Sequence, residues 1–68
     1  MIVNQVKKYR LEQELTQQEL AELVDVRRET IGRLENQLYN PSLELALKIS
    51  DILGQDVNEI FQLKNEGK

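Results

Sequence analysis

The stretch from Thr16 to Glu35, TQQELAELVDVRRETIGRLE, constrains the fold of this chain more than any other. Apolar residues recur in it at the three- and four-residue spacing of an amphipathic helix, first in one short segment and then in a second. The two residues between the segments, Asp25 and Val26, are too few to form a flexible linker. The sequence therefore predicts two short helices that pack against each other across a tight turn.

The first of these helices carries a start signal. Thr16 and Glu19 have the spacing of a capping box, in which the threonine hydroxyl accepts a hydrogen bond from the amide three residues on, and the glutamate carboxylate accepts one from the threonine amide. Such a cap stabilises a helix by about 1 kcal/mol. We expect one side of this helix to be buried, through Leu20, Ala21 and either Leu23 or Val24.

The second helix is predicted to run from Arg27 or Arg28 to Glu35. Its inner side is expected to hold Ile31 and Leu34. Polar residues occupy its start and its outer side: Arg27, Arg28, Glu29, Thr30 and Arg33. A helix, a tight turn and a second helix with a polar start can place side chains in the major groove of DNA. Gly32 costs this helix about 1 kcal/mol relative to alanine, and we expect it to allow another backbone to come close.

The remaining segments predict three more helices. The first has Asn4 as its N-cap and ends near Gln13. Its inward-facing residues are expected to be Val6, Tyr9 and Leu11. Ser42 is expected to cap the fourth helix of the chain, and Gly54 to end it in the left-handed conformation. The apolar spacing of that helix predicts a buried face of Leu43, Ala46, Leu47, Ile49, Ser50 and Leu53.

The C-terminal segment, about residues 55–64, is more apolar than a solvated tail requires. A short fifth helix capped by Asp56 is predicted to start at Val57 and end near Phe61, followed by an extended tail that pairs with Ile2 and Val3 as a two-stranded ribbon. The apolar residues of the segment are Val57, Ile60, Phe61 and Leu63. They either close the core or form the self-complementary face of a C2 homodimer, and we expect both roles on different sides of the segment.

The net charge of −3 and the isoelectric point of about 4.9 argue, taken alone, against a nucleic-acid partner, since binding to phosphates needs positive charge at the contact surface. The charge is unevenly distributed, however. Six of the nine basic residues lie in the first half: Lys7, Lys8, Arg10, Arg27, Arg28 and Arg33. After Gln37, five acidic residues face three lysines. We therefore expect a local basic patch on an acidic protein and modest non-specific affinity for DNA.

Other classes of protein are disfavoured by what the sequence lacks. One domain of 68 residues without cysteine or histidine has no disulfide framework and no Cys/His zinc site, and the absence of cysteine fits a cytoplasmic location. No apolar run approaches the roughly 20 residues of a membrane span, and the N-terminus lacks the apolar region of a signal peptide. Carboxylates scattered over helix surfaces, with no glycine-rich phosphate loop, predict no enzyme and no cofactor.

Taken together, these residues resemble the Cro/cI-type helix-turn-helix family, also called the xenobiotic-response-element family. The resemblance covers Val6 to Phe61 and rests on Arg10, Leu15-Thr16-Gln17, Leu20-Ala21, Val26, Thr30-Ile31, Leu34-Glu35, Asn40-Pro41-Ser42-Leu43, Ile49 and Leu53. The two ends are similar to a branch of very small homodimeric regulators, the cytolysin-operon repressor type. The resemblance implies an all-α, five-helix, lambda-repressor-like DNA-binding domain with a short antiparallel ribbon of the N- and C-terminal segments.

The resemblance also implies which residues contact DNA: Gln17, Arg27, Arg28, Glu29, Thr30, Arg33, Tyr39 and Asn40. Arg28 suits guanine as a bidentate donor, and Glu29 can accept a hydrogen bond from cytosine. Gln17 and Arg27 are assigned to phosphates, and Arg33 to a further base or phosphate.

Most of these assignments have a plainer alternative, which for Gln17 is an ordinary residue in the first turn of a helix. Arg28 and Glu29 are also consistent with a solvated surface pair, and Thr30 with packing. Asn40 suits a local Asx turn before the next helix, and Tyr39 a cover for the core.

Arg10 and Glu35 are implied to form a scaffold ion pair that fixes the angle of the second helix. The alternative is two unrelated surface charges. Two positions depart from the family pattern: Asp25 stands where glycine is frequent in the turn, and Arg27 stands where serine often caps the helix. Aspartate tolerates the left-handed conformation better than most residues.

The function predicted from the sequence is a sequence-specific regulator of transcription, a repressor that binds double-stranded DNA as a homodimer. Two recognition helices, each about residues 27–35, would read an inverted repeat with half-sites about 34 Å apart. No sensor domain is recognisable, so occupancy of the DNA site is expected to be set by the concentration of the protein, by a partner or by a second regulatory protein. The alternative is a protein-interaction module of the same fold, as in an antitoxin or a coactivator bridge, which the acidic isoelectric point and Glu29 favour slightly.

Overall fold

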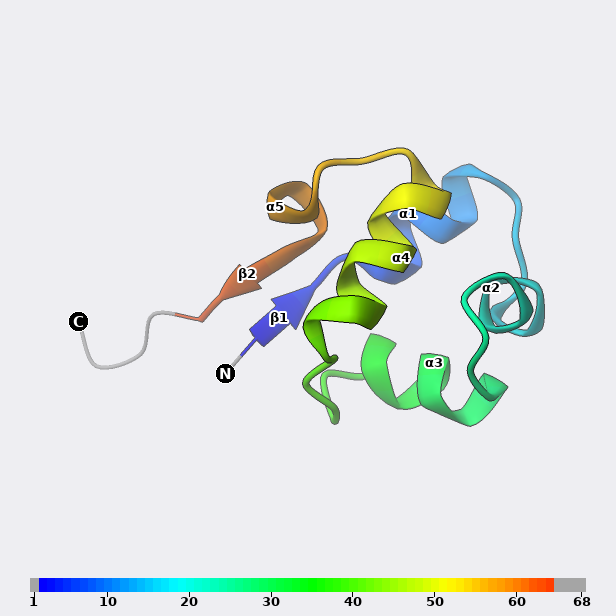
Figure 1. The fold of residues 1–68 in the computed structure, drawn as a ribbon, viewed down its shortest axis with the longest axis horizontal. Coiled ribbons are helices and arrows are strands. Elements are labelled where there is room, and N and C mark those ends of the chain that lie inside the picture. Colours follow the sequence, from blue (N-terminus) through cyan, green and yellow to red (C-terminus); the bar gives the residue numbers. More distant parts are fainter. Residues whose placement is uncertain (1, 65–68) are drawn as a thin grey trace.

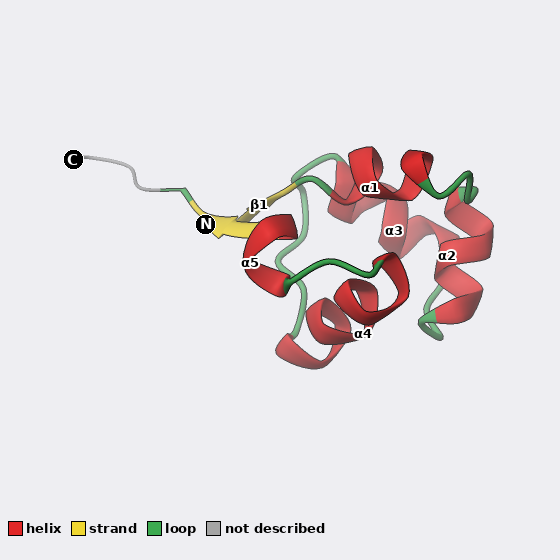
Figure 2. Ribbon diagram, turned by 90° about the horizontal axis from the view of Figure 1, so that it is seen from above, coloured by secondary structure: helices red, strands yellow, loops and turns green. Residues whose placement is uncertain are grey.

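The computed structural model describes residues 2–64, which form five helices and two strands. The strands project at one side of the molecule (Figure 1). The elements are β1 (Ile2–Asn4), α1 (Val6–Glu12), α2 (Gln17–Leu23), α3 (Arg28–Glu35), α4 (Leu43–Leu53), α5 (Val57–Ile60) and β2 (Phe61–Leu63). The view in Figure 2 also places the strands at one end and α2 at the other. The predicted five-helix fold with a terminal ribbon is confirmed.

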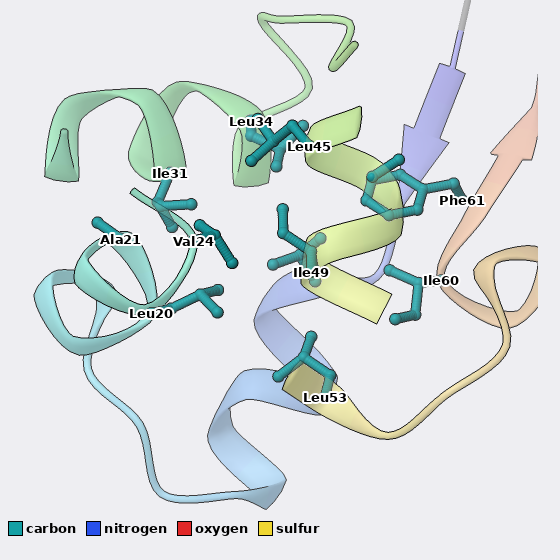
Figure 3. Close-up of a cluster of buried hydrophobic side chains, with 12 residues drawn as sticks. Leu20, Ala21, Val24, Ile31, Leu34, Leu45, Ile49, Leu53, Ile60 and Phe61 are labelled. Carbon is teal, nitrogen blue, oxygen red and sulfur yellow. The ribbon is translucent and has the colours of Figure 1, made fainter. Parts of the chain in front are cut away.

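The core is built from apolar side chains of all five helices and of β2. Its buried members are Val6, Leu20, Ala21, Val24, Ile31, Leu34, Leu45, Ala46, Ile49, Leu53, Ile60 and Phe61. In Figure 3, Ile49 of α4 lies between side chains of α2 and α3 on one side and those of the C-terminal segment on the other. Helix α4 therefore connects the two ends of the molecule. Burying one such leucine or isoleucine contributes about 1.5–3 kcal/mol.

The predicted helix ends are confirmed in four places, one of which is Asp56, whose Oδ1 accepts from the amide of Asn58 at 3.4 Å at the start of α5. The capping box is formed, because Thr16 Oγ1 accepts from the Glu19 amide at 3.0 Å and Glu19 Oε1 accepts from the Thr16 amide at 2.8 Å. Ser42 Oγ accepts from the amide of Leu45 at 3.1 Å. Gly54 ends α4 with φ of 68°, a conformation that glycine adopts without steric cost. The start of α1 differs, because Gln5 occupies the N-cap position while Asn4 lies in β1.

Four leucines expected or considered as buried are instead exposed: Leu11, Leu23, Leu43 and Leu47. On α2 it is Val24 that is buried. On α4 the prediction missed Leu45, which is only 6% exposed. Leu43 and Leu47 each lie two residues from Leu45, which is a rotation of about 200° around the helix. The apolar spacing fitted either of two opposite faces of α4, and packing selected the one that includes Leu45.

Two further expectations are corrected. A Cβ at Gly32 would meet only the side chain of Gln17, at 3.8 Å from Oε1, so no backbone approaches this glycine. Ile60 is 1% exposed within a single chain and belongs to the core, so it cannot serve as a surface contact in a dimer. Phe61 is also buried, at 8% exposed.

The ribbon predicted from the alternation near the C-terminus is present. β1 and β2 pair antiparallel, with Ile2 opposite Leu63 and Asn4 opposite Phe61. Phe61 and Leu63 are two residues apart on β2 and so point to the same face of the ribbon. Phe61 is nevertheless part of the core, whereas Leu63 is 78% exposed. Among residues 2–64, no helix is long and apolar enough to cross a membrane.

Candidate nucleic-acid interface

The turn between α2 and α3 depends on a left-handed residue. Asp25 has φ of 62°, as the sequence suggested for this position. The turn is closed by the amide of Val26, which donates to the carbonyl of Ala21 at 3.0 Å. Arg27 then adopts an extended conformation at the N-cap of α3, and its side chain makes no capping hydrogen bond. The departure at Arg27 therefore leaves the start of α3 in place but without a side-chain cap.

The exposed side of α3 is predominantly cationic. Ile31 and Leu34 are fully buried, so the opposite side of the helix faces solvent. Exposed there are Arg27, Arg28, Glu29 and Arg33, with Thr30 half-buried beside them. Within the described part of the chain, the side chains of Arg27, Glu29 and Arg33 have no hydrogen-bond or ion-pair partner. Three guanidinium groups against one carboxylate form a local basic surface on an acidic protein.

Behind this surface, Arg10 and Glu35 form a buried, bidentate ion pair. The Arg10 Nε–Glu35 Oε2 distance is 2.7 Å, and Arg10 Nη2 donates to Glu35 Oε1 at 3.1 Å. The remaining terminal nitrogen of Arg10 donates to the carbonyl of Leu15 at 2.7 Å. The two side chains are 7% and 2% exposed. The pair therefore ties α1 to the C-terminal end of α3, and the alternative of two unrelated surface charges does not apply.

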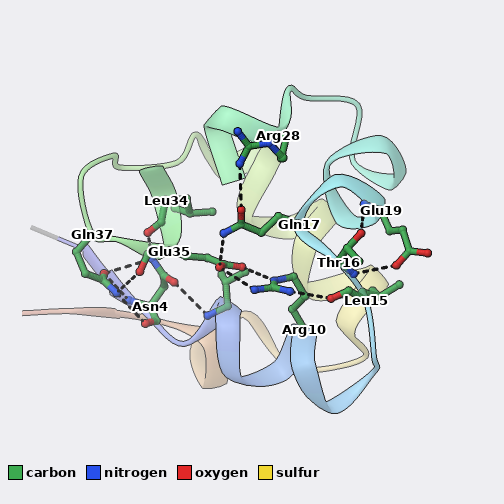
Figure 4. Close-up of polar contacts among 11 residues, drawn as sticks. Asn4, Arg10, Leu15, Thr16, Gln17, Glu19, Arg28, Leu34, Glu35 and Gln37 are labelled. Atoms are coloured by element: carbon green, nitrogen blue, oxygen red, sulfur yellow. Dashed lines mark hydrogen bonds and ion pairs between the residues drawn. The ribbon is translucent and has the colours of Figure 1, made fainter. Parts of the chain in front are cut away.

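Gln17 connects this buried pair to the exposed surface (Figure 4). Its Nε2 donates to Glu35 Oε1 at 3.0 Å, while its Oε1 accepts from Arg28 Nη1 at 3.3 Å. The sequence assigned Gln17 only to a phosphate and missed this bridge. Its one available signal was that a glutamine, unlike a glutamate or a lysine, can donate and accept at once.

The other two residues predicted to contact DNA, Tyr39 and Asn40, lie in the loop after α3 but face different parts of the molecule. Tyr39 adjoins the turn, where with Val24 and Asp25 it lines a hollow of about 210 Å³. Asn40 lies toward the ribbon instead, and its Oδ1 accepts from the amide of Ile2 at 3.3 Å. This bond joins Asn40 to a residue far away in the sequence. It is therefore not the bond of the local Asx turn that was considered for Asn40.

Comparison with known proteins agrees with this geometry. The family described as Helix-turn-helix matches residues 6–60. The chain belongs to the Cro/cI-type helix-turn-helix family of DNA-binding regulators. Within this helix-turn-helix protein, α2 and α3 are the two helices of the motif.

Relatives and solved structures cover most of the chain. A protein of Archaeoglobus fulgidus described as an uncharacterized HTH-type transcriptional regulator is 46% identical over 61 residues, which are 90% of this chain and 86% of that protein. The structure of a candidate DNA-binding protein from Bacteroides fragilis superimposes with a TM-score of 0.82 at 27% identity, over 91% of this chain and 100% of that one. The structure of the restriction-modification controller protein C.AhdI from Aeromonas hydrophila superimposes with a TM-score of 0.74 at 30% identity, over 79% of this chain and 82% of that one.

Proposed function

We propose that this helix-turn-helix protein is a cytoplasmic, sequence-specific repressor of transcription that binds an inverted repeat as a homodimer. The observation that carries the proposal is the cationic outer side of α3, where Arg27, Arg28 and Arg33 are exposed on a chain of net charge −3. Concentrating positive charge there directs one surface to the phosphates and base edges of DNA. The small size of this domain and its terminal ribbon also fit the cytolysin-operon repressor branch of the family.

Arg28 is the proposed base-reading residue. Its bond to Gln17 is 3.3 Å long and exposed, at the weak end of the hydrogen-bond range. Guanine O6 and N7 can therefore replace Gln17 as acceptors at little cost, while Gln17 stays anchored on Glu35. Glu29, the next residue in the sequence, is proposed to accept a hydrogen bond from cytosine and to disfavour other bases at that position.

The surrounding residues are proposed to hold the DNA backbone. Arg27 and Arg33 flank the base-reading residue and suit phosphates, as does a half-buried Thr30 hydroxyl. Tyr39 is 39% exposed next to the turn. Asn40 uses its carbonyl oxygen for Ile2 and retains its amide group as a donor for a phosphate.

The ribbon is proposed as the dimer contact. Leu63 is 78% exposed at its tip, and with Ile2 and Asn58 it lines an open hollow of about 410 Å³. A C2 axis would let one apolar patch serve both subunits. Val57, which is half-buried, and the rim of Phe61 extend this face, whereas Ile60 is excluded from it.

The deciding experiment is selection of duplexes from a random pool with the purified chain, followed by sequencing. We expect enrichment of an inverted repeat whose half-sites are centred about one helical turn apart. Enrichment of a direct repeat would contradict the homodimer, and no enrichment at low salt would favour the protein-interaction module.

The dimer has its own test in analytical ultracentrifugation. Leu63→Asp should convert a dimer to a folded monomer, because it places two carboxylates at the axis. Leu11→Asp is the matched control, since Leu11 is an exposed leucine on α1. A dimeric Leu63→Asp protein would exclude the ribbon as the contact.

A further inference from the structure

Gln37 has a backbone conformation that its residue type does not favour. It follows α3 with φ of 63°, in the left-handed region where glycine or asparagine is usual after a helix. Within residues 2–64, Glu14 and Asp25 are the other non-glycine residues with positive φ, and both side chains are exposed. Gln37 differs because its side chain is half-buried and bonded at both ends. A strained position kept by a fully engaged side chain points to a role for that side chain.

The partner of Gln37 is Asn4, 33 residues earlier. The Asn4 amide donates to Gln37 Oε1 at 3.1 Å, and Gln37 Nε2 donates to the Asn4 carbonyl at 3.2 Å. The side chain of Asn4 in turn donates to the carbonyl of Leu34 at 2.8 Å. Gln37 Nε2 also reaches the carbonyl of Glu35 at 3.3 Å. We call these two residues, with the Gln37 side chain bonded to the main chain of Asn4 and the Asn4 side chain bonded to α3, the Asn4–Gln37 bracket; Figure 4 shows it at the left.

The bracket joins two elements that have separate tasks. Leu34 and Glu35 end α3, and their carbonyls are among those that a helix leaves without an internal partner. Asn4 ends β1, where it lies opposite Phe61 in the ribbon. The last turn of the recognition helix is thus hydrogen-bonded directly to β1, one of the two strands of the ribbon proposed as the dimer contact.

We propose that Asn4 and Gln37 are positioning residues that fix α3 relative to the dimer axis and so set the half-site spacing the protein accepts. This inference rests on the proposed function. On B-DNA, one inserted base pair moves a half-site by about 3.4 Å and rotates it by about 35° around the duplex. A recognition helix held rigidly to the ribbon cannot follow that change, whereas one freed from the ribbon can.

The test uses the full chain and duplexes that carry the selected half-site twice, at the selected spacing and with one base pair added or removed. The wild-type protein should bind the selected spacing about tenfold more tightly than either altered one, comparable to the cost of a mismatch. Gln37→Gly keeps the left-handed backbone but removes the bracket. It should bind a single half-site as the wild type does while its preference for spacing falls to about threefold or less.

Two further variants separate positioning from folding. Asn4→Ala keeps the two main-chain bonds to Gln37 but removes the bonds that Asn4 Nδ2 donates to the Leu34 carbonyl and to Gln37 Oε1, so it should flatten the preference less than Gln37→Gly does. Glu14→Gly is the control, because Glu14 also has a left-handed backbone but its side chain is exposed and has no described partner. This variant should keep the wild-type preference for spacing. Folding of each variant is checked by circular dichroism and dimerisation by sedimentation.

Three outcomes would overturn the inference, and they differ from one another. A folded, dimeric Gln37→Gly protein with the wild-type spacing preference excludes positioning. An equal loss of affinity for every duplex, the single half-site included, shows that the bracket is only structural. A wild-type protein that selects no inverted repeat removes the proposed function itself, and this inference with it.

Discussion

The two ends of this small domain are held together by different interactions. At the end that carries α2 and α3, a bidentate ion pair between Arg10 and Glu35 lies almost fully out of solvent. At the ribbon end, the partly buried neutral amides of Asn4 and Gln37 make the contacts. Figure 1 shows these ends on opposite sides of α4. The helix-turn-helix end thus depends on a buried charge pair, in which loss of one partner leaves the other charge uncompensated. The ribbon end depends on partly buried hydrogen bonds between neutral groups.

The largest expected effect is loss of one member of the ion pair. Glu35→Ala should destabilise the protein by about 3–5 kcal/mol, because the Arg10 guanidinium would stay buried without its carboxylate. Urea unfolding measures this change. Lys48→Ala is the control, since the Lys48–Glu44 pair at 3.2 Å is on the surface and should contribute less than about 1 kcal/mol. Similar losses in the two variants would contradict the contrast between buried and exposed pairs.

A smaller effect is expected on DNA binding from the exposed side of α3. Arg28→Ala should weaken binding to the selected operator by about 1–3 kcal/mol and relax specificity at one base pair. Fluorescence anisotropy titrations at several salt concentrations measure both. Lys8→Ala, which removes an exposed cation from α1, should leave affinity and salt dependence near the wild-type values. A base preference unchanged in Arg28→Ala would assign Arg28 to the backbone.

The capping box should have a more modest effect on stability. Thr16→Ala should cost about 1 kcal/mol, because the Glu19 amide loses its acceptor. Thr16→Ser keeps the hydroxyl and should unfold at nearly the wild-type urea concentration. If alanine and serine behave alike, the methyl group rather than the cap stabilises this end.

The smallest effects are expected at the left-handed positions, where the two ends can be compared directly. Asp25→Gly and Glu14→Gly should stabilise the protein by about 0.5–1 kcal/mol, because glycine relieves the positive φ. Gln37→Gly relieves the same conformation but loses the hydrogen bonds to Asn4, so its gain should be absent or reversed. Thermal unfolding of the three variants side by side measures the difference. An equal gain in all three would mean that the bracket adds no stability.

Much of the helix-turn-helix end could be predicted from the sequence because its signals lie within one or two helical turns. Thr16 and Glu19 are three residues apart, and the polar start of α3 is continuous in the chain. The left-handed conformation of Asp25 was expected because the resemblance places a frequent glycine at this turn position and aspartate tolerates that conformation. Arg10 and Glu35 were paired only through the resemblance, since nothing local connects two charges that are 25 residues apart.

The sequence by itself determined the helices, the caps of α2, α4 and α5 and the tight turn, because each depends on a short pattern or on local backbone preference. The antiparallel ribbon pairs the two ends of the described chain, and it was expected mainly from the resemblance. Only the tertiary structure decided that α4 buries Leu45 and exposes Leu43 and Leu47, since its apolar residues suit two faces. It also decided that Gln17 bridges Glu35 to Arg28 and that Gln37 meets Asn4. These contacts join distant segments, so they exist only once all the helices have packed around Ile49.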